Sequence, residues 1–386
     1  MLDRDVFMLP PKETGCVNKV WKLKKCLYSL NDAARQFYVS LAAELVKLGC
    51  KQSELDPTMY HKKDVNGQLI GMIVTYVDDF LHCGNGQFDQ EVMVPLRKRF
   101  ISGRVEQSNF KYVGLQIRQR REGIVVDQGM FFENLETVPV EPGVKSEELS
   151  GAAYSRFRAA VGSLNWGVSG SRPDLAYDVI EHSTKFNKAT KADMDKVNKS
   201  IMKGKIMLEN RFSVLGPTVK WKLVGFSDAA WANLPDEVSS TMGYVIFLVG
   251  DEEKCAPLCW KSNKIKRVVR STLAAETLAL VEMIEMMVYV RSLLKETGLF
   301  TTNPLIAVVD NQSLRDAIYS TKLVDDKRLR VDMACIKESM NKREVEAVKW
   351  CSGEVQLANC LTKRGACTES LRAVLQSGTL PLSKYL

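Results

Sequence analysis

The chain has 386 residues, enough for two or three domains, and its apolar (45%) and charged (26%) fractions are those of ordinary globular proteins. Its formal net charge of +8 suits a polyanionic partner, although many proteins of this charge bind no nucleic acid. No stretch is apolar enough to span a membrane, no signal-peptide pattern is present, and the ten cysteines lack the spacing of a disulfide framework. We therefore expect a soluble intracellular protein, in either the cytoplasm or the nucleus.

The first part of the chain is predicted to contain a helix followed by a hairpin. Asn31 or Asp32 can cap the helix, and Gly49 can end it. Asn66–Gly67 then separates two strand-like runs and is a strong hairpin signal.

A second turn is expected at Asp78–Asp79, between two apolar strands. Two adjacent carboxylates at the tip of an apolar hairpin can hold a shared cation. The alternative is an ordinary solvated turn, because Asp is common in turns.

The middle of the chain is predicted to be mostly helical. A short helix, a hairpin turning at Glu122–Gly123 and an acidic, Pro-containing linker come first, at residues 92–100, 110–128 and 133–151. Three helices follow at residues 154–167, 175–186 and about 193–208.

From Thr218 onward the pattern indicates a mixed sheet with helices on its faces. We expect five strands, at residues 219–228, 241–250, 258–264, 304–310 and 345–350. Apolar residues at helical spacing predict a long helix over residues 270–298, a short one from 311, another over 326–340 and a last one over 355–363.

Three carboxylates stand at notable places in this pattern. Asp228 and Asp310 each follow an apolar strand, and Glu276 lies within the first two turns of the long helix. Taken singly, each can be a solvated turn or helix-start residue. If the first and fourth strands are neighbours, all three converge, and repulsion between them calls for a hard divalent cation such as Mg²⁺, with Mn²⁺ as an alternative. Two such ions about 4 Å apart would support phosphodiester hydrolysis.

Basic side chains surround two of these elements and suggest a nucleic-acid surface. They are Lys261, Lys264, Lys266, Arg267 and Arg270 before the long helix, and Lys327 and Arg328 after the Asp310 helix. Trp231 and Trp260 could pack against a backbone or a base. The alternative is a solvated face with core tryptophans. Cys255 and Cys259 have no histidine nearby, so a zinc site is not expected.

An ordered set of motifs resembles one family. KLKKCLYSLNDAARQFY, LDPTMY, YVDD, VGSLNW, SRPDLAY, SDAAWA, STLAAE, VDNQSL and LANCLTK follow one another as in the end of the Pol polyprotein of copia-type LTR retrotransposons. The resemblance covers nearly the whole chain. It implies a partial reverse-transcriptase palm at 1–140, a helical connection at 141–215, a ribonuclease H-like domain at 216–370 and a C-terminal tail at 371–386.

The resemblance also implies roles for individual residues. Asp78 and Asp79 correspond to the metal-binding pair of the polymerase palm. Asp228, Glu276 and Asp310 correspond to the first three carboxylates of the ribonuclease H site, which would bind Mg²⁺ and cut the RNA strand of an RNA–DNA hybrid. Asn359 occupies the place of the family's fourth acidic residue, where an amide can touch a cation but brings no charge.

These correspondences lead to an expected function and two alternatives. The family's other polymerase Asp motif would lie upstream of Met1, so polymerisation is expected to be lost, and RNA–DNA hybrid hydrolysis is the expected remaining activity. The first alternative is a catalytically inactive remnant that binds nucleic acid. The second is that the sequence is an incomplete gene model, which the start in the middle of a domain favours.

Overall fold

The computed structural model describes residues 4–16, 19–27, 30, 32–100, 103–299, 304–322 and 324–385. Their contacts divide them into two compact units. One holds the chain up to Val105 together with Glu296–Leu299, and the other holds the remainder. Asn31, one of the two predicted helix caps, lies outside the described residues.

The first unit is an antiparallel sheet with helices packed on it. Strands β3 (Lys51–Gln52), β4 (Met59–Lys63), β5 (Leu69–Tyr76) and β6 (Asp79–Gly84) pair in sequence order. Helix α1 (Ala33–Lys47) buries Leu41 and Leu45 against the sheet side of this unit's core. The unit also contains β1 (Phe7–Met8), β2 (Trp21–Lys22), α2 (Gly86–Phe88), a π-helical turn η2 (Asp89–Met93) and α3 (Val94–Arg99).

The second unit begins with a four-stranded antiparallel sheet and a helical layer. The sheet order is β10 (Asn210–Ser213), β9 (Gly123–Asp127), β8 (Leu115–Arg120) and β7 (Asn109–Tyr112). The helices are α4 (Gly129–Asn134), α5 (Gly151–Gly170), α6 (Ala176–Ser183) and α7 (Lys191–Gly204). The predicted linker is irregular after α4, yet Leu135, Val138, Val140 and Leu149 pack against the core of this unit.

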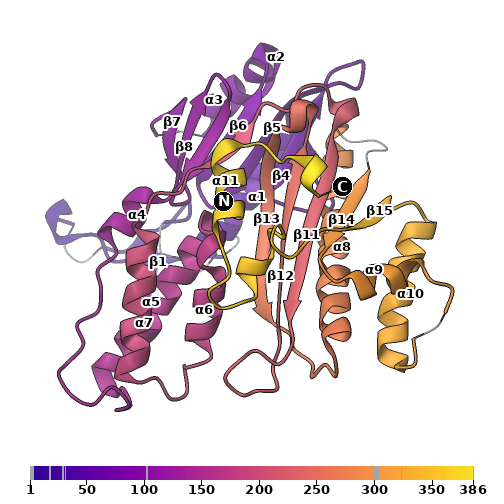
Figure 1. Ribbon diagram of the computed structural model, residues 1–386. Helices are drawn as coiled ribbons and strands as arrows, with labels where there is room; N and C mark the ends of the chain where they lie inside the picture. Colours follow the sequence, from indigo (N-terminus) through magenta and orange to yellow (C-terminus); the bar gives the residue numbers. More distant parts are fainter. Residues whose placement is uncertain are drawn as a thin grey trace. The chain divides into compact units, whose positions relative to one another are not determined.

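A five-stranded mixed sheet forms the centre of the second unit (Figure 1). Its order is β13 (Cys255–Lys264), β12 (Thr241–Val249), β11 (Lys222–Ala230), β14 (Leu305–Val309) and β15 (Ala347–Trp350). The first three strands are antiparallel, whereas β14 runs parallel to β11 and β15 runs parallel to β14. The predicted mixed five-stranded sheet is confirmed.

Helices cover both faces of this sheet, as expected (Figure 1). One face packs against α8 (Thr272–Thr297), α9 (Gln312–Tyr319) and α10 (Lys327–Asn341). The other packs against α5, α6, α7 and α11 (Glu369–Ser377). Helix α8 packs closely on β11 at Gly225, which has no side chain. A Cβ atom at this position would lie only 2.7 Å from the sulfur atoms of Met283 and Met287.

The predicted helix over residues 355–363 is wrong. Only a 3₁₀ turn, η6 (Asn359–Leu361), forms there. Gln356 Nε2 donates to the Ser227 carbonyl on β11 over 3.1 Å, and the Thr362 carbonyl accepts from Thr241 Oγ1 on β12 over 2.8 Å. These hydrogen bonds tie the segment to the sheet and override its helical periodicity.

The last residues of the described chain belong to the core. Helix α11 lies in the segment predicted as a tail, and Leu371, Val374, Leu375, Leu380 and Tyr385 are buried. The remaining short 3₁₀ turns are η1 (Lys12–Thr14), η3 (Pro173–Leu175), η4 (Thr218–Lys220), η5 (Asp251–Glu253) and η7 (Leu382–Lys384). None of the helices in the described part of the chain is both long and apolar enough to cross a membrane.

Candidate metal centre

Two neighbouring parallel strands bring Asp228 and Asp310 together. Phe226 on β11 pairs with Val308 on β14, and each Asp follows two residues later. Asp228 lies inside β11 and is fully buried, while Asp310 directly follows β14 and is largely covered. The first and fourth strands of the predicted sheet are therefore neighbours, which is the condition under which the carboxylates converge.

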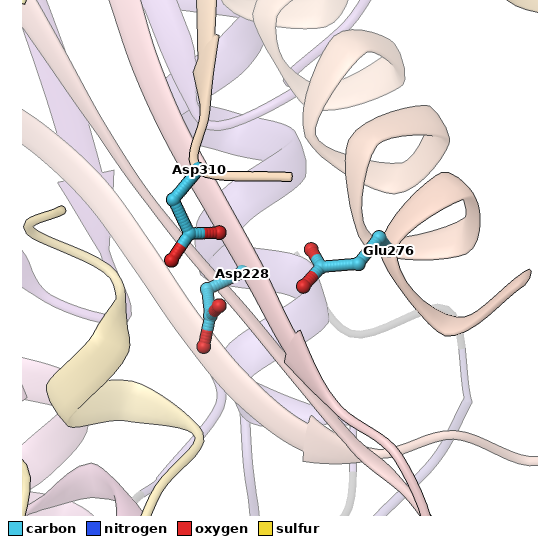
Figure 2. Close-up of side chains that lie close together, drawn as sticks. All are labelled: Asp228, Glu276 and Asp310. Carbon is cyan, nitrogen blue, oxygen red and sulfur yellow. The ribbon is translucent and has the colours of Figure 1, made fainter. Parts of the chain in front are cut away.

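Glu276 completes the cluster from the second turn of α8. Its exposed fraction is 3%, so it points inward rather than into solvent. One carboxylate oxygen from each of Asp228, Glu276 and Asp310 lies within 4.8 Å of the other two. Figure 2 shows the three side chains pointing toward one another. Among the described residues, this is the one group of three or more Asp, Glu, His or Cys side chains so arranged.

The electrostatics of the cluster are unfavourable without a cation. Burial, followed by the charges of Asp228 and Asp310, raises the pKa of Glu276 to about 9. Burial also raises the pKa of Asp228 to about 6, although Lys363 opposes that shift, and it raises the pKa of Asp310. Three acids whose charged forms are all disfavoured form a site that a divalent cation would stabilise.

The segment around η6 closes one side of the cluster. Lys363 Nζ lies 2.9 Å from Asp228 Oδ1, 2.6 Å from Asn359 Oδ1 and 4.0 Å from Asp310 Oδ2. Thr362 Oγ1 donates to Asp228 Oδ2. Asn359 therefore lies at the cluster, with its amide nitrogen donating to the Gly353 carbonyl. Sequence reasoning missed Lys363 and Thr362, because both lie in the motif LANCLTK but reach the cluster only through the hydrogen bonds that tie this segment to the sheet.

The donor set fits a hard divalent cation. All three converging groups offer carboxylate oxygens, which Mg²⁺ and Mn²⁺ prefer. Glu276 Oε2 is buried and has no hydrogen-bond partner among the described residues. A buried carboxylate oxygen without a partner is costly unless a cation occupies the space beside it. Asp228, Glu276 and Asp310 are therefore the residues that could hold the ion.

Comparison with known proteins relates both units to one kind of polyprotein. The family described as Reverse transcriptase (RNA-dependent DNA polymerase) matches residues 1–137. The Retrovirus-related Pol polyprotein from transposon RE1 of Arabidopsis thaliana is 28% identical over 94% of this chain and 25% of its own length. That from transposon TNT 1-94 of Nicotiana tabacum is 24% identical over 94% of this chain and 28% of its own length. The chain corresponds to a segment of a copia-type retrotransposon Pol polyprotein.

The chain spans about a quarter of the length of the curated relatives that it matches. Among solved structures, RNase H1 from the halophilic archaeon Halobacterium salinarum aligns with 39% of this chain and 98% of its own chain, with 15% identity and a TM-score of 0.27.

Asp78 and Asp79, predicted as a metal-binding pair, lie at or beside a hairpin tip. The turn falls at Val77–Asp78, one residue earlier than predicted, because Tyr76 pairs with Asp79 across the two strands. Val77 has φ of 55°, a left-handed conformation that is strained for a β-branched residue. Asp78 and Asp79 are both exposed, and no third Asp, Glu, His or Cys side chain joins them in the described residues. Their role as metal ligands stays a prediction.

An ion pair links the segments that carry the two predicted basic groups. Arg267, before α8, forms an ion pair with Asp332 on α10, whose first residues are Lys327 and Arg328. Lys266, Arg270, Lys327 and Arg328 are exposed. Lys261 pairs with Glu282, and Lys264 pairs with Asp236 over 3.3 Å, so the charges of these two lysines are partly satisfied within the protein. The nucleic-acid-binding role of all seven residues stays a prediction.

The two tryptophans have different environments. Trp260 packs against the core, and its indole nitrogen donates to the Val168 carbonyl over 2.7 Å. Trp231 is 46% exposed, and its indole nitrogen donates to the Val269 carbonyl over 3.0 Å. Trp231 therefore presents an aromatic face beside the basic segment before α8, whereas Trp260 is structural.

Proposed function

We propose that the second unit hydrolyses the RNA strand of RNA–DNA hybrids with bound Mg²⁺ or Mn²⁺. The observation that carries this proposal is the convergence of Asp228, Glu276 and Asp310 within 4.8 Å, with a buried Glu276 oxygen that has no partner in the described residues. The motifs around these residues are those of a copia-type Pol polyprotein, which supports the same substrate class.

In this proposal the acidic residues bind the metal ion and the basic residues bind the substrate. Asp228, Glu276 and Asp310 would hold the divalent ion, which when bound would activate a water molecule and stabilise the departing oxygen. Lys266, Arg270, Lys327 and Arg328 would bind backbone phosphates, because these cations are exposed and the segment before α8, which leads to Glu276, is joined to α10 by the Arg267–Asp332 ion pair. The substrate differs from duplex DNA by its 2′-OH groups and A-like shape.

A cleavage assay on the full chain tests the proposal. We expect Mg²⁺-dependent or Mn²⁺-dependent cutting of a labelled RNA–DNA hybrid, with a DNA duplex of the same sequence left intact. Asp228→Asn removes a buried ligand charge and is expected to lower the rate by about 100-fold or more. Metal-dependent cutting that is equally fast in Asp228→Asn would refute the assigned site.

A second candidate function is hybrid binding without cleavage. The observation that favours it is that Asn359 is neutral and that Lys363 already pairs with Asp228 over 2.9 Å. In that case the wild-type protein binds the hybrid with a steep salt dependence and leaves it uncut. Cutting that appears only in Asn359→Asp would show a nuclease scaffold silenced by one missing charge.

A further inference from the structure

A lysine enters the acidic cluster from the solvent side. The side chain of Lys363 is 41% exposed, yet its ammonium group lies 2.9 Å from Asp228 Oδ1 and 2.6 Å from Asn359 Oδ1. A lysine ammonium is a compact point charge on a flexible four-carbon stem with three donors. It can therefore fill a cation position in this cluster and can also leave that position for solvent.

The carboxylate oxygens of the cluster differ in how many hydrogen-bond and ion-pair partners they have. Asp228 is engaged at both oxygens, by Lys363 at Oδ1 and by Thr362 at Oδ2. Asp310 Oδ2 is 4.0 Å from the same ammonium group. On the opposite side, Glu276 Oε2 is buried and has no hydrogen-bond partner within the described part of the chain. The positive charge supplied by the chain is thus concentrated at the Asp228–Asn359 side, and the Glu276 side is left for an external cation.

We infer that Lys363 acts as a built-in cation at the Asp228–Asn359 side, so that the site takes one divalent ion rather than two. This inference rests on the proposed function, since it concerns the same metal centre. Formal charge supports it, because three ionised carboxylates are balanced by one ammonium group and one divalent ion. A second divalent ion binds only when the Lys363 side chain swings out.

The same reasoning links Lys363 to Asn359. If residue 359 carried a carboxylate, four negative charges would be balanced by two divalent ions with the lysine displaced. With the neutral Asn359, a second divalent ion would leave excess positive charge. Lys363 and Asn359 therefore act together in setting the number of ions, and neither substitution alone should give the full effect.

Metal-binding measurements on the full chain test this inference without relying on activity. We would titrate the protein with Mn²⁺, following free Mn²⁺ by electron paramagnetic resonance, and with Mg²⁺ by calorimetry. The variants are Lys363→Met, Lys363→Arg, Asn359→Asp and the double variant N359D/K363M. Lys384→Met removes the same charge from an exposed position on η7 and is the matched control. Asp228→Asn is the loss control, and circular dichroism checks folding.

We expect one Mn²⁺ per wild-type chain, about 10-fold tighter binding in Lys363→Met, and a second ion in the double variant. Lys363→Arg and Lys384→Met should bind like the wild type. Two ions in the wild type, with no change in Lys363→Met, would overturn the inference and leave the proposed function standing. No ion in the wild type or in any variant would overturn both.

Discussion

The burial of Glu276 is explained by metal binding and not by the stability of the metal-free fold. Its carboxylate is 3% exposed and faces Asp228 and Asp310. Burial and these two charges disfavour its ionised form, so the metal-free protein carries an unfavourable electrostatic energy there. Sites of this kind are stabilised by their ligand and destabilise the empty fold.

Replacing Glu276 by Gln should therefore stabilise the metal-free protein. We expect the free energy of unfolding of the second unit to rise by about 1–3 kcal/mol at pH 8, because the wild-type carboxyl, whose pKa is raised to about 9 in the fold, must take up a proton when the chain folds, whereas Gln keeps the side-chain shape without that cost. Urea denaturation followed by circular dichroism, with a metal chelator present, would measure it. Addition of Mg²⁺ should stabilise the wild type and not the variant.

Glu285 offers a matched control, since it lies exposed on the same helix. Glu285→Gln should change the unfolding free energy by less than about 0.5 kcal/mol, as is usual for surface substitutions. A loss of stability in Glu276→Gln would show instead that the carboxylate makes a net favourable contact in the metal-free fold.

At the scale of secondary structure, the sequence predicts elements well where periodicity and caps agree. The long helix was expected over residues 270–298, and α8 covers Thr272–Thr297 with Ser271 Oγ accepting from the Ala274 amide. Residues 355–363 carry a similar periodicity but form only η6, because Gln356 and Thr362 bond to neighbouring strands. Such tertiary bonds leave no trace in local periodicity, and the position of Lys363 depends on them.

The contact between α6 and α7 contains a buried histidine that should make the second unit sensitive to acid. His182 Nε2 lies 2.9 Å from Ser200 Oγ, and burial lowers the pKa of His182 to about 4, with Asp178 opposing and Lys196 assisting the shift. In the unfolded chain His182 therefore becomes protonated near pH 6.5, whereas in the folded chain it becomes protonated only near pH 4. Stability is complete above pH 6.5 and falls as the pH drops through this window.

The His182→Gln variant should lack this part of the acid sensitivity. We expect the wild type to lose about 3 kcal/mol more than the variant between pH 7 and pH 4. Urea denaturation at both pH values would measure the difference. At pH 7 the two proteins should be similar, since His182 is neutral in the folded and unfolded states alike. An equal loss of unfolding free energy in both proteins would show that His182 is not the source of the acid sensitivity.

At the scale of the whole molecule, the described chain has two units whose buried clusters do not share residues. Leu41, Leu45 and Ile73 belong to a cluster confined to the first unit. Phe226, Val245 and Tyr385 belong to a cluster confined to the second. Tyr385, near the end of the described chain, packs edge-to-face against Phe226 with ring centroids 4.9 Å apart. The terminal segment thus supports the strand that carries Asp228.

This separation predicts that core substitutions act on one unit at a time. Tyr385→Ala leaves a cavity against Phe226 and should destabilise the second unit by about 3 kcal/mol, whereas Leu45→Ala should destabilise the first by a similar amount. Hydrogen exchange resolved by mass spectrometry distinguishes the two, because it reports each segment separately. Faster exchange in β11 and β12 with unchanged β4 and β5 is expected for Tyr385→Ala, and the reverse for Leu45→Ala. Faster exchange in all four strands with either substitution would show that the two units unfold as one cooperative structure.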